Sequence, residues 1–225
     1  MPSAPDQPHR PRPLVLLHGL GQSPIAWQDF VSAYGAGRPM TAPWMKGLRP
    51  KDPVGFDLAA AADGVADELE LQGVRQADFV AVSVGASVAL RLAVQRPELV
   101  GRLVLAGALV RPGRGALRLQ KIAMRLVPEG KLVDAGVSRP RMLAVLDALK
   151  GFDGTESLRD VTAPVLLVAG SKDKAGVTAA QALSQQLPTA RVQVVDGAGS
   201  LVNTESAREL ADLAHAFLDD TDPAA

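Results

Sequence analysis

A serine stands where the pattern of the chain changes abruptly. The apolar run of residues 79–82, Phe-Val-Ala-Val, predicts a buried strand. Ser83 ends this run, and Gly85 and Ala86 then open a stretch whose apolar residues recur at helical spacing. A strand-to-helix turn this tight needs small neighbours and holds its central residue in strained backbone geometry. The pattern therefore predicts a serine hydroxyl exposed at the carboxyl end of a strand, where it is placed to act as a nucleophile.

Two other loops carry polar residues directly after apolar runs. His18 and Gly19 follow residues 14–17, and Asp173 follows residues 164–170. In parallel sheets, ligands bind at the carboxyl ends of the strands. We therefore expect these loops to lie at the same edge of a sheet as Ser83.

The elements that must position these loops alternate along the chain. The expected strands cover residues 14–17, 39–43, 79–82, 100–110, 164–170 and 191–195, and the expected helices cover residues 26–31, 56–71, 84–95, 176–187 and 205–219. Such alternation is typical of a mostly parallel sheet with helices on both faces, the α/β class.

Composition narrows the function classes. The 225 residues suffice for one core, and 24 Lys and Arg balance 24 Asp and Glu, so no net charge favours nucleic acid or a membrane surface. Cysteine is absent, which excludes disulfides and thiolate chemistry. No apolar run reaches the roughly 18 residues of a membrane helix. We expect a cytoplasmic protein of small-molecule metabolism with a disordered tail at residues 1–13, and we expect no metal or other cofactor.

Three segments together resemble the α/β-hydrolase family. Residues 81–85, Ala-Val-Ser-Val-Gly, are similar to its nucleophile elbow, with alanine where the motif usually begins with glycine. His18-Gly19 resembles the family's oxyanion loop, and residues 169–173 resemble the loop that carries the triad acid, here Asp173. The resemblance implies an oxyanion hole formed by the backbone N–H groups of Leu20 and Val84.

The resemblance also implies a domain layout. Residues 14–110 and 164–220 would form the hydrolase core, and residues 111–163 would form a short helical cap over the site, with helices at residues 116–127 and 140–149. Apolar cap residues would favour an apolar small-molecule ligand.

The final loop departs from the family pattern. Residues 195–205 match the loop that carries the catalytic histidine, but Ser200 occupies that position. The chain has three histidines: His9 lies in the tail, His18 belongs to the oxyanion loop, and His215 falls within the last expected helix. No acid–base histidine is evident.

Three function classes follow from this incomplete set of Ser83, Asp173 and Ser200. Serine needs a base to become nucleophilic, and a hydroxyl at position 200 cannot exchange a proton near pH 7. Our first interpretation is non-hydrolytic chemistry on a carbonyl compound, such as cyclisation, elimination or isomerisation, with Asp173 as a base. A conventional esterase or lactonase with an unrecognised base and a non-catalytic binding protein remain as alternatives. Asp173 could also merely cap the helix that follows it.

Substrate-binding candidates lie in the same loops and in the cap. They are Gly19, Trp27, Trp44, Met124 and Met142. Trp44 occupies a turn where the family often has aspartate, which indicates either a repacked loop or a reshaped cavity wall. Core packing is the alternative role for the tryptophans.

The expected cap also carries a run of basic residues at helical spacing. They are Arg111, Arg114, Arg118, Lys121 and Arg125, and they share one helical face. They could dock an acidic carrier protein or a phosphate-bearing substrate, or they could form a solvated outer face.

Overall fold

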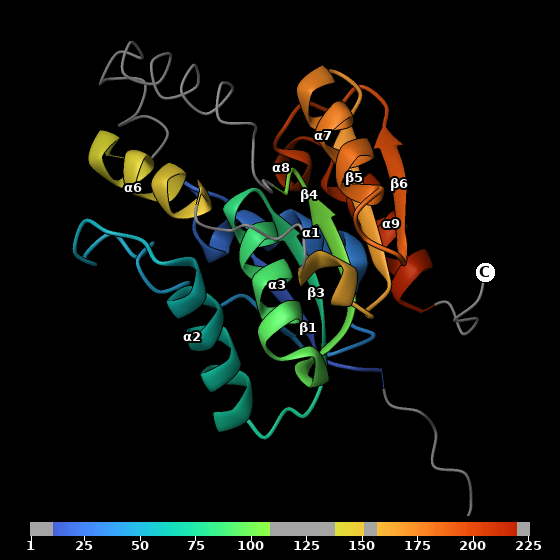
Figure 1. Cartoon of the computed structure of the whole chain (residues 1–225). Helices are drawn as coiled ribbons and strands as arrows, with labels where there is room; N and C mark the ends of the chain where they lie inside the picture. The colour runs from blue at the N-terminus through green and yellow to red at the C-terminus, as the bar shows by residue number, and fades with distance from the viewer. Residues whose placement is uncertain (1–10, 109–137, 151–156, 220–225) are drawn as a thin grey trace, which may run out of the picture.

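The structure, a computed structural model, describes residues 11–108, 138–150 and 157–219. At the centre of this part of the chain lies a six-stranded sheet in the order β2-β1-β3-β4-β5-β6, with every neighbouring pair parallel (Figure 1). The strands are β1 (Leu14–Leu17), β2 (Met40–Thr41), β3 (Ala77–Val82), β4 (Val100–Ala106), β5 (Val165–Gly170) and β6 (Ala190–Val195). The predicted α/β class is confirmed.

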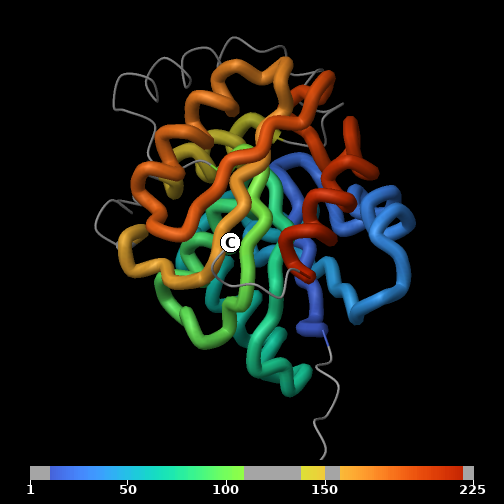
Figure 2. Tube along the Cα trace, turned by 90° about the vertical axis from the view of Figure 1, so that its right-hand side faces the viewer, coloured from blue at the N-terminus to red at the C-terminus, as the bar shows by residue number. Residues whose placement is uncertain are grey.

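Both faces of the central strands are apolar because helices cover both of them. In β1, Val15 and Leu17 belong to one buried cluster, while Leu14 and Leu16 belong to the other. The first cluster includes residues of α2 (Leu58–Leu71), α3 (Val84–Gln95) and α7 (Lys174–Ser184), and the second includes residues of α1 (Gln28–Tyr34) and α9 (Ala207–Leu218). Figure 2 shows α1 in blue and α9 in red on one side of the sheet, with α7 in orange on the other.

Most expected elements are present with small shifts of their ends. The expected helix of residues 26–31 begins as a short 3-10 turn, η1 (Pro24–Trp27), before α1. The expected helix of residues 205–219 corresponds to α9, which begins at Ala207, and a short helix, α8 (Val202–Glu205), precedes it. Ser206 separates the two because it has the non-helical backbone angles φ −143° and ψ 50°. β2 is only two residues long. Prolines at 39 and 43 flank it and lack the N–H group that a ladder needs.

Two further short 3-10 turns, η2 (Pro97–Leu99) and η3 (Ser157–Asp160), precede β4 and β5. One cap helix, α6 (Arg139–Lys150), matches the expectation for residues 140–149. The expected helix of residues 116–127, with Met124 and the basic run, lies outside the described residues. The boundaries of the expected tail, core and cap stay predictions.

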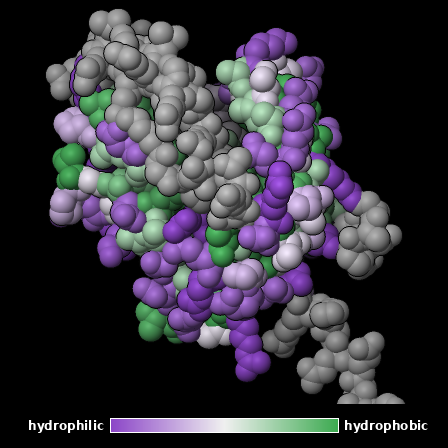
Figure 3. Space-filling view, viewed as in Figure 1, coloured by the Kyte–Doolittle hydropathy of each residue, from purple (hydrophilic) through white to green (hydrophobic). Residues whose placement is uncertain are grey.

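The surface of the described residues shows large apolar side chains only at scattered positions. The exposed ones are Ile25, Val31, Val54, Leu71, Val194 and Leu201, which lie on separate elements. On the face drawn in Figure 3, hydrophilic and apolar side chains form small mixed groups. None of the described helices combines the length and the apolar character that crossing a bilayer requires.

Candidate functional site

Ser83 lies between β3 and α3 in strained backbone geometry. Its φ of 54° is the one positive value at a non-glycine residue in the described part of the chain. The Ser83 N–H donates to the carbonyl oxygen of Ala106 at the end of β4, at 2.8 Å. Such geometry costs about 1–3 kcal/mol and persists where the surroundings impose it, which occurs most often at functional sites. The predicted strand–turn–helix around the serine is therefore present.

Two glycines, which lack a Cβ atom, allow neighbouring backbone segments to approach the serine closely. A Cβ atom on Gly85 would lie 2.4 Å from the carbonyl oxygen of Leu17 and 2.7 Å from that of His18. A Cβ atom on Gly19 would lie 3.3 Å from Cβ of Ser83. The loop after β1 therefore lies directly beside the serine, as the sequence predicted.

The proposed oxyanion donors have no competing acceptor in the described structure. Neither the Leu20 N–H nor the Val84 N–H donates a hydrogen bond to a described residue. Val84 is the first residue of α3, where the N–H has no acceptor within the helix. The neighbouring Gly19 N–H is engaged by Oε1 of Gln22 at 2.9 Å. This pattern fits the expected hole, whose two donors stay a prediction.

Gln22 and Asn203 join the loop after β1 to the final loop. Nε2 of Gln22 donates to Oδ1 of Asn203 at 3.2 Å, and Nδ2 of Asn203 donates back to Oε1 of Gln22 at 3.3 Å. Asn203 is fully buried and also donates to the carbonyl oxygen of Ala26. Neither residue was predicted from the sequence, although Gln22 stands only three residues after Gly19.

His18 is buried in the wall of the site. Its Nδ1 lies 2.9 Å from the carbonyl oxygen of Gly19, which can only accept, so Nδ1 carries the proton. Nε2 is buried and has no hydrogen-bond partner among the residues that the structure describes. Burial lowers the pKa of His18 below its ordinary 6.5, against the raising effect of the Gly19 carbonyl. The Trp44 ring meets the His18 ring edge-on, with the centroids 5.1 Å apart.

The loop after β5 uses Asp173 to begin a helix. Oδ1 of Asp173 accepts the N–H of Gly176 at 2.9 Å, which is an N-cap bond at the start of α7. The capping role that the sequence left open is therefore present. Since a carboxylate has further lone pairs, the cap does not by itself exclude a second role.

The final loop is held together by its own polar groups. The carboxylate of Glu205 accepts the N–H groups of Gly199 at 2.6 Å and Leu201 at 3.3 Å, and Ser200 between them is exposed. A Cβ atom on Gly170 would lie 2.1 Å from the carbonyl oxygen of Gly199, so the ends of β5 and β6 are in close contact.

The remaining described histidine lies elsewhere. His215 is 62% exposed on α9, and its Nδ1 lies 3.3 Å from the Asp219 carboxylate on the same helix. His9 is outside the described residues. The structure therefore supplies no described histidine at the position of the family's base.

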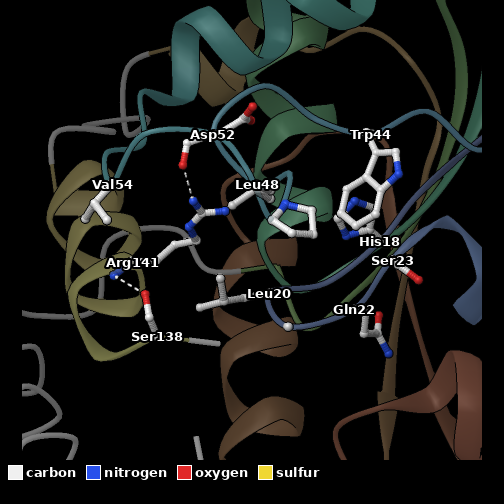
Figure 4. Close-up of a pocket in the computed structure, with 12 residues that line it drawn as sticks. His18, Leu20, Gln22, Ser23, Trp44, Leu48, Asp52, Val54, Ser138 and Arg141 are labelled. Carbon is white, nitrogen blue, oxygen red and sulfur yellow. Dashed lines mark hydrogen bonds between the residues drawn. The ribbon is translucent and has the colours of Figure 1, made fainter. Parts of the chain in front are cut away.

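A cavity of about 600 Å³ adjoins the loop after β1 (Figure 4). Its described lining comes from His18 and residues 20–23, from the loop of residues 44–54, from Ser138 just before α6, and from Arg141 in its first turn. Leu20 and Trp44 are in the wall. Ser83 is not among the described lining residues but adjoins them through Gly19.

Three other binding candidates, Gly19, Trp27 and Met142, lie outside this described lining. Trp27 is 1% exposed and packs edge-on against Phe30 in the cluster beneath α1 and α9, so core packing accounts for its position. Met142 is buried on α6, and its role in binding stays a prediction, as does that of Gly19. The described residues hold no group of three or more His, Asp and Glu side chains that could bind a metal.

Comparisons with known proteins agree with this geometry. A pimeloyl-[acyl-carrier protein] methyl ester esterase from Neisseria meningitidis is 28% identical over 74% of this chain and 76% of its own length. An α/β-hydrolase enzyme from a Medee basin deep-sea metagenome library superposes with a TM-score of 0.81 at 17% identity, over 97% of this chain and 93% of its own. The enol-lactonase from Burkholderia xenovorans gives 0.78 at 18% identity, over 95% and 94%. Both superpositions show a shared fold.

A family model settles the relationship. The model described as "Alpha/beta hydrolase family" matches residues 14–213, which includes Ser83, Asp173 and Ser200. The chain belongs to the α/β-hydrolase family.

Proposed function

We propose that this protein binds a small apolar carbonyl or ester compound beside Ser83 and activates its carbonyl group for a non-hydrolytic step. The observation that carries the proposal is the strained elbow at Ser83, kept together with two unengaged N–H groups although Ser200 stands at the base position. Strain of this kind has no benefit for an ordinary core turn.

The chemistry follows from where negative charge develops. When the carbonyl oxygen accepts the N–H groups of Leu20 and Val84, an enolate at that oxygen is stabilised by about 3–4 kcal/mol per donor. The α-proton passes to the Asp173 carboxylate as the C–H electron pair moves toward the carbonyl oxygen. Return of the proton at another carbon gives isomerisation, and loss of a group from the β-carbon gives elimination.

The substrate class is supported by the relatives. The names of two of them, a methyl ester esterase and an enol-lactonase, describe compounds with an ester carbonyl. The cavity of about 600 Å³ falls in the size range of small-molecule sites. Leu20, Trp44 and Leu48 give it apolar walls.

Ester hydrolysis is the second candidate, and the names of the relatives favour it. Hydrolysis requires a base for Ser83. Of the two described histidines, His18 is the one that lies in the loops around Ser83. The Nε2 atom of His18 is buried, and the Trp44 ring packs edge-on against the imidazole.

Labelling with a fluorophosphonate, followed by intact mass, separates the two candidates. We expect slow or no labelling of the protein and labelling of Ser200→His, since removing the histidine base typically costs on the order of 10⁶ in turnover. Ser83→Ala serves as the control that must not react. Fast labelling of the protein that is lost in Ser83→Ala would make hydrolysis the leading function.

A second measurement tests for non-hydrolytic turnover. Deuterium exchange at the α-carbon of an apolar β-keto ester, followed by NMR in D₂O, reports enolate formation directly. We expect exchange above the buffer rate, lost in Asp173→Asn. Ligand binding without exchange would instead identify a binding protein.

A further inference from the structure

One cationic side chain reaches into the described wall of the cavity. Arg141, on the first turn of α6, extends between Leu20 and Asp52 in Figure 4. Most of the wall around it is apolar and is formed by Leu20, Trp44, Leu48, Pro50 and Val54. A fixed guanidinium on an apolar wall can pair with an anionic group of a ligand, and a neutral ligand would not use this interaction.

Neutral groups hold the Arg141 guanidinium in place. Its two terminal nitrogens donate to the carbonyl oxygens of Arg49 and of Asp52, the latter at 2.6 Å. No ion pair joins Arg141 to a carboxylate of the described residues. A guanidinium has more N–H donors than these two bonds use, so donors remain for a ligand.

The acidic residue in the described wall is already engaged elsewhere. The Asp52 carboxylate accepts the N–H groups of Gly47 at 2.7 Å and Arg49 at 3.1 Å. It therefore closes the loop of residues 47–52, and this loop presents its carbonyl oxygens to Arg141. Arg141 is therefore an oriented, half-buried cation that forms no ion pair with a described carboxylate.

We propose that the ligand carries a carboxylate, which pairs with Arg141 while its apolar body lies along Trp44 and Leu48. A planar guanidinium matches a carboxylate in a two-point hydrogen-bonded pair, and partial burial strengthens that pair. The carbonyl to be activated would lie on the side of the cavity toward Ser83, within reach of the Leu20 and Val84 N–H groups. This inference rests on the proposed function and narrows its substrates to apolar oxo acids or half-esters.

Binding of two matched probes tests the inference by calorimetry. 4-Phenylbutyrate and 4-phenylbutyramide share their apolar body and differ in charge. We expect the carboxylate to bind about tenfold more tightly, which corresponds to one charge-assisted hydrogen-bonded contact. Arg141→Gln should abolish this preference, and Arg141→Lys should retain part of it. Arg208→Gln, an equal change of charge on exposed α9, should leave it intact.

The outcomes separate this inference from the proposed function. Equal affinity for the two probes, or a preference that survives Arg141→Gln, overturns the role of Arg141. If both probes bind equally and α-carbon exchange persists, the proposed function stands. If neither probe binds, the role of Arg141 is overturned, and α-carbon exchange alone decides the proposed function.

Discussion

Two regions at the carboxyl edge of the sheet treat their polar groups differently. In the serine region, comprising residues 18–22 and 83–85, the N–H groups of Leu20 and Val84 are unengaged within the described structure and Ser83 is strained. In the final-loop region, comprising residues 170–173 and 196–205, Asp173 caps a helix and Glu205 binds two backbone N–H groups. The first region keeps groups available for a ligand, and the second uses its groups to hold its own loops.

This difference indicates which part of a hydrolase site the chain retains. Stabilising an oxyanion requires N–H donors in fixed positions, and in the proposed site the loop after β1 and the start of α3 would supply them as backbone. Activating a serine requires a histidine and an acid that orients it, and our sequence interpretation places Ser200 at the position of that histidine. Carbonyl binding can therefore survive without proton transfer to and from the serine.

Matched glycine substitutions in the two regions should have the largest effects on stability and binding. In Gly85→Ala the new Cβ would meet the Leu17 carbonyl oxygen at 2.4 Å, and in Gly170→Ala it would meet the Gly199 carbonyl oxygen at 2.1 Å. We expect each to lower the free energy of unfolding by about 3 kcal/mol in urea titrations. Only Gly85→Ala should also abolish binding of 4-phenylbutyrate.

Gly37→Ala is the control, because nothing lies within 4 Å of its Cβ position. If Gly170→Ala abolished binding as completely as Gly85→Ala, at a temperature where both variants are folded, the two regions would not be separable.

Asn203 provides the link between the regions, and its removal should have the next largest effect. Asn203→Ala leaves the Gln22 amide without its buried partner, which we expect to cost about 2 kcal/mol of unfolding free energy. Because Gln22 holds the Gly19 N–H, binding beside Leu20 should weaken as well. Calorimetry on Asn203→Ala and on Gln22→Ala checks this, and unchanged affinity in both would show that the link has no role in shaping the serine region.

The sequence predicted the serine region better than the cavity. Ser83, Gly85 and Gly19 were found because a tight turn restricts residue type and backbone angle together. Arg141 and Asn203 carry no such local pattern, since their partners lie 89 to 181 positions away in the chain. Trp27 shows the same limit: residue type alone could not distinguish a core tryptophan from a cavity-wall one such as Trp44.

Asp173 tests whether the final-loop region has kept any chemical role. Asp57 caps α2 through a bond to the Ala60 N–H at 2.7 Å and is a matched cap outside the described cavity lining. We expect Asp173→Ala and Asp57→Ala each to cost about 1 kcal/mol of unfolding free energy. Only Asp173→Ala should remove α-carbon deuterium exchange. Equal exchange in the two variants would leave Asp173 as a cap alone.

The pH dependence of stability gives the smallest expected effect and concerns His18. Burial lowers its pKa in the folded state below the ordinary 6.5, so the unfolded chain binds more protons as the pH falls through 6.5. The contribution of neutral His18 is therefore complete above pH 6.5 and is lost progressively as the pH decreases toward its folded-state pKa. In urea titrations from pH 5 to 8, we expect His18→Gln to flatten this slope, while His215→Gln on the exposed face of α9 preserves it. An unchanged slope in His18→Gln would mean that the imidazole beside Trp44 is reached by protons from solvent, and the serine region would then be more open than its buried Nε2 indicates.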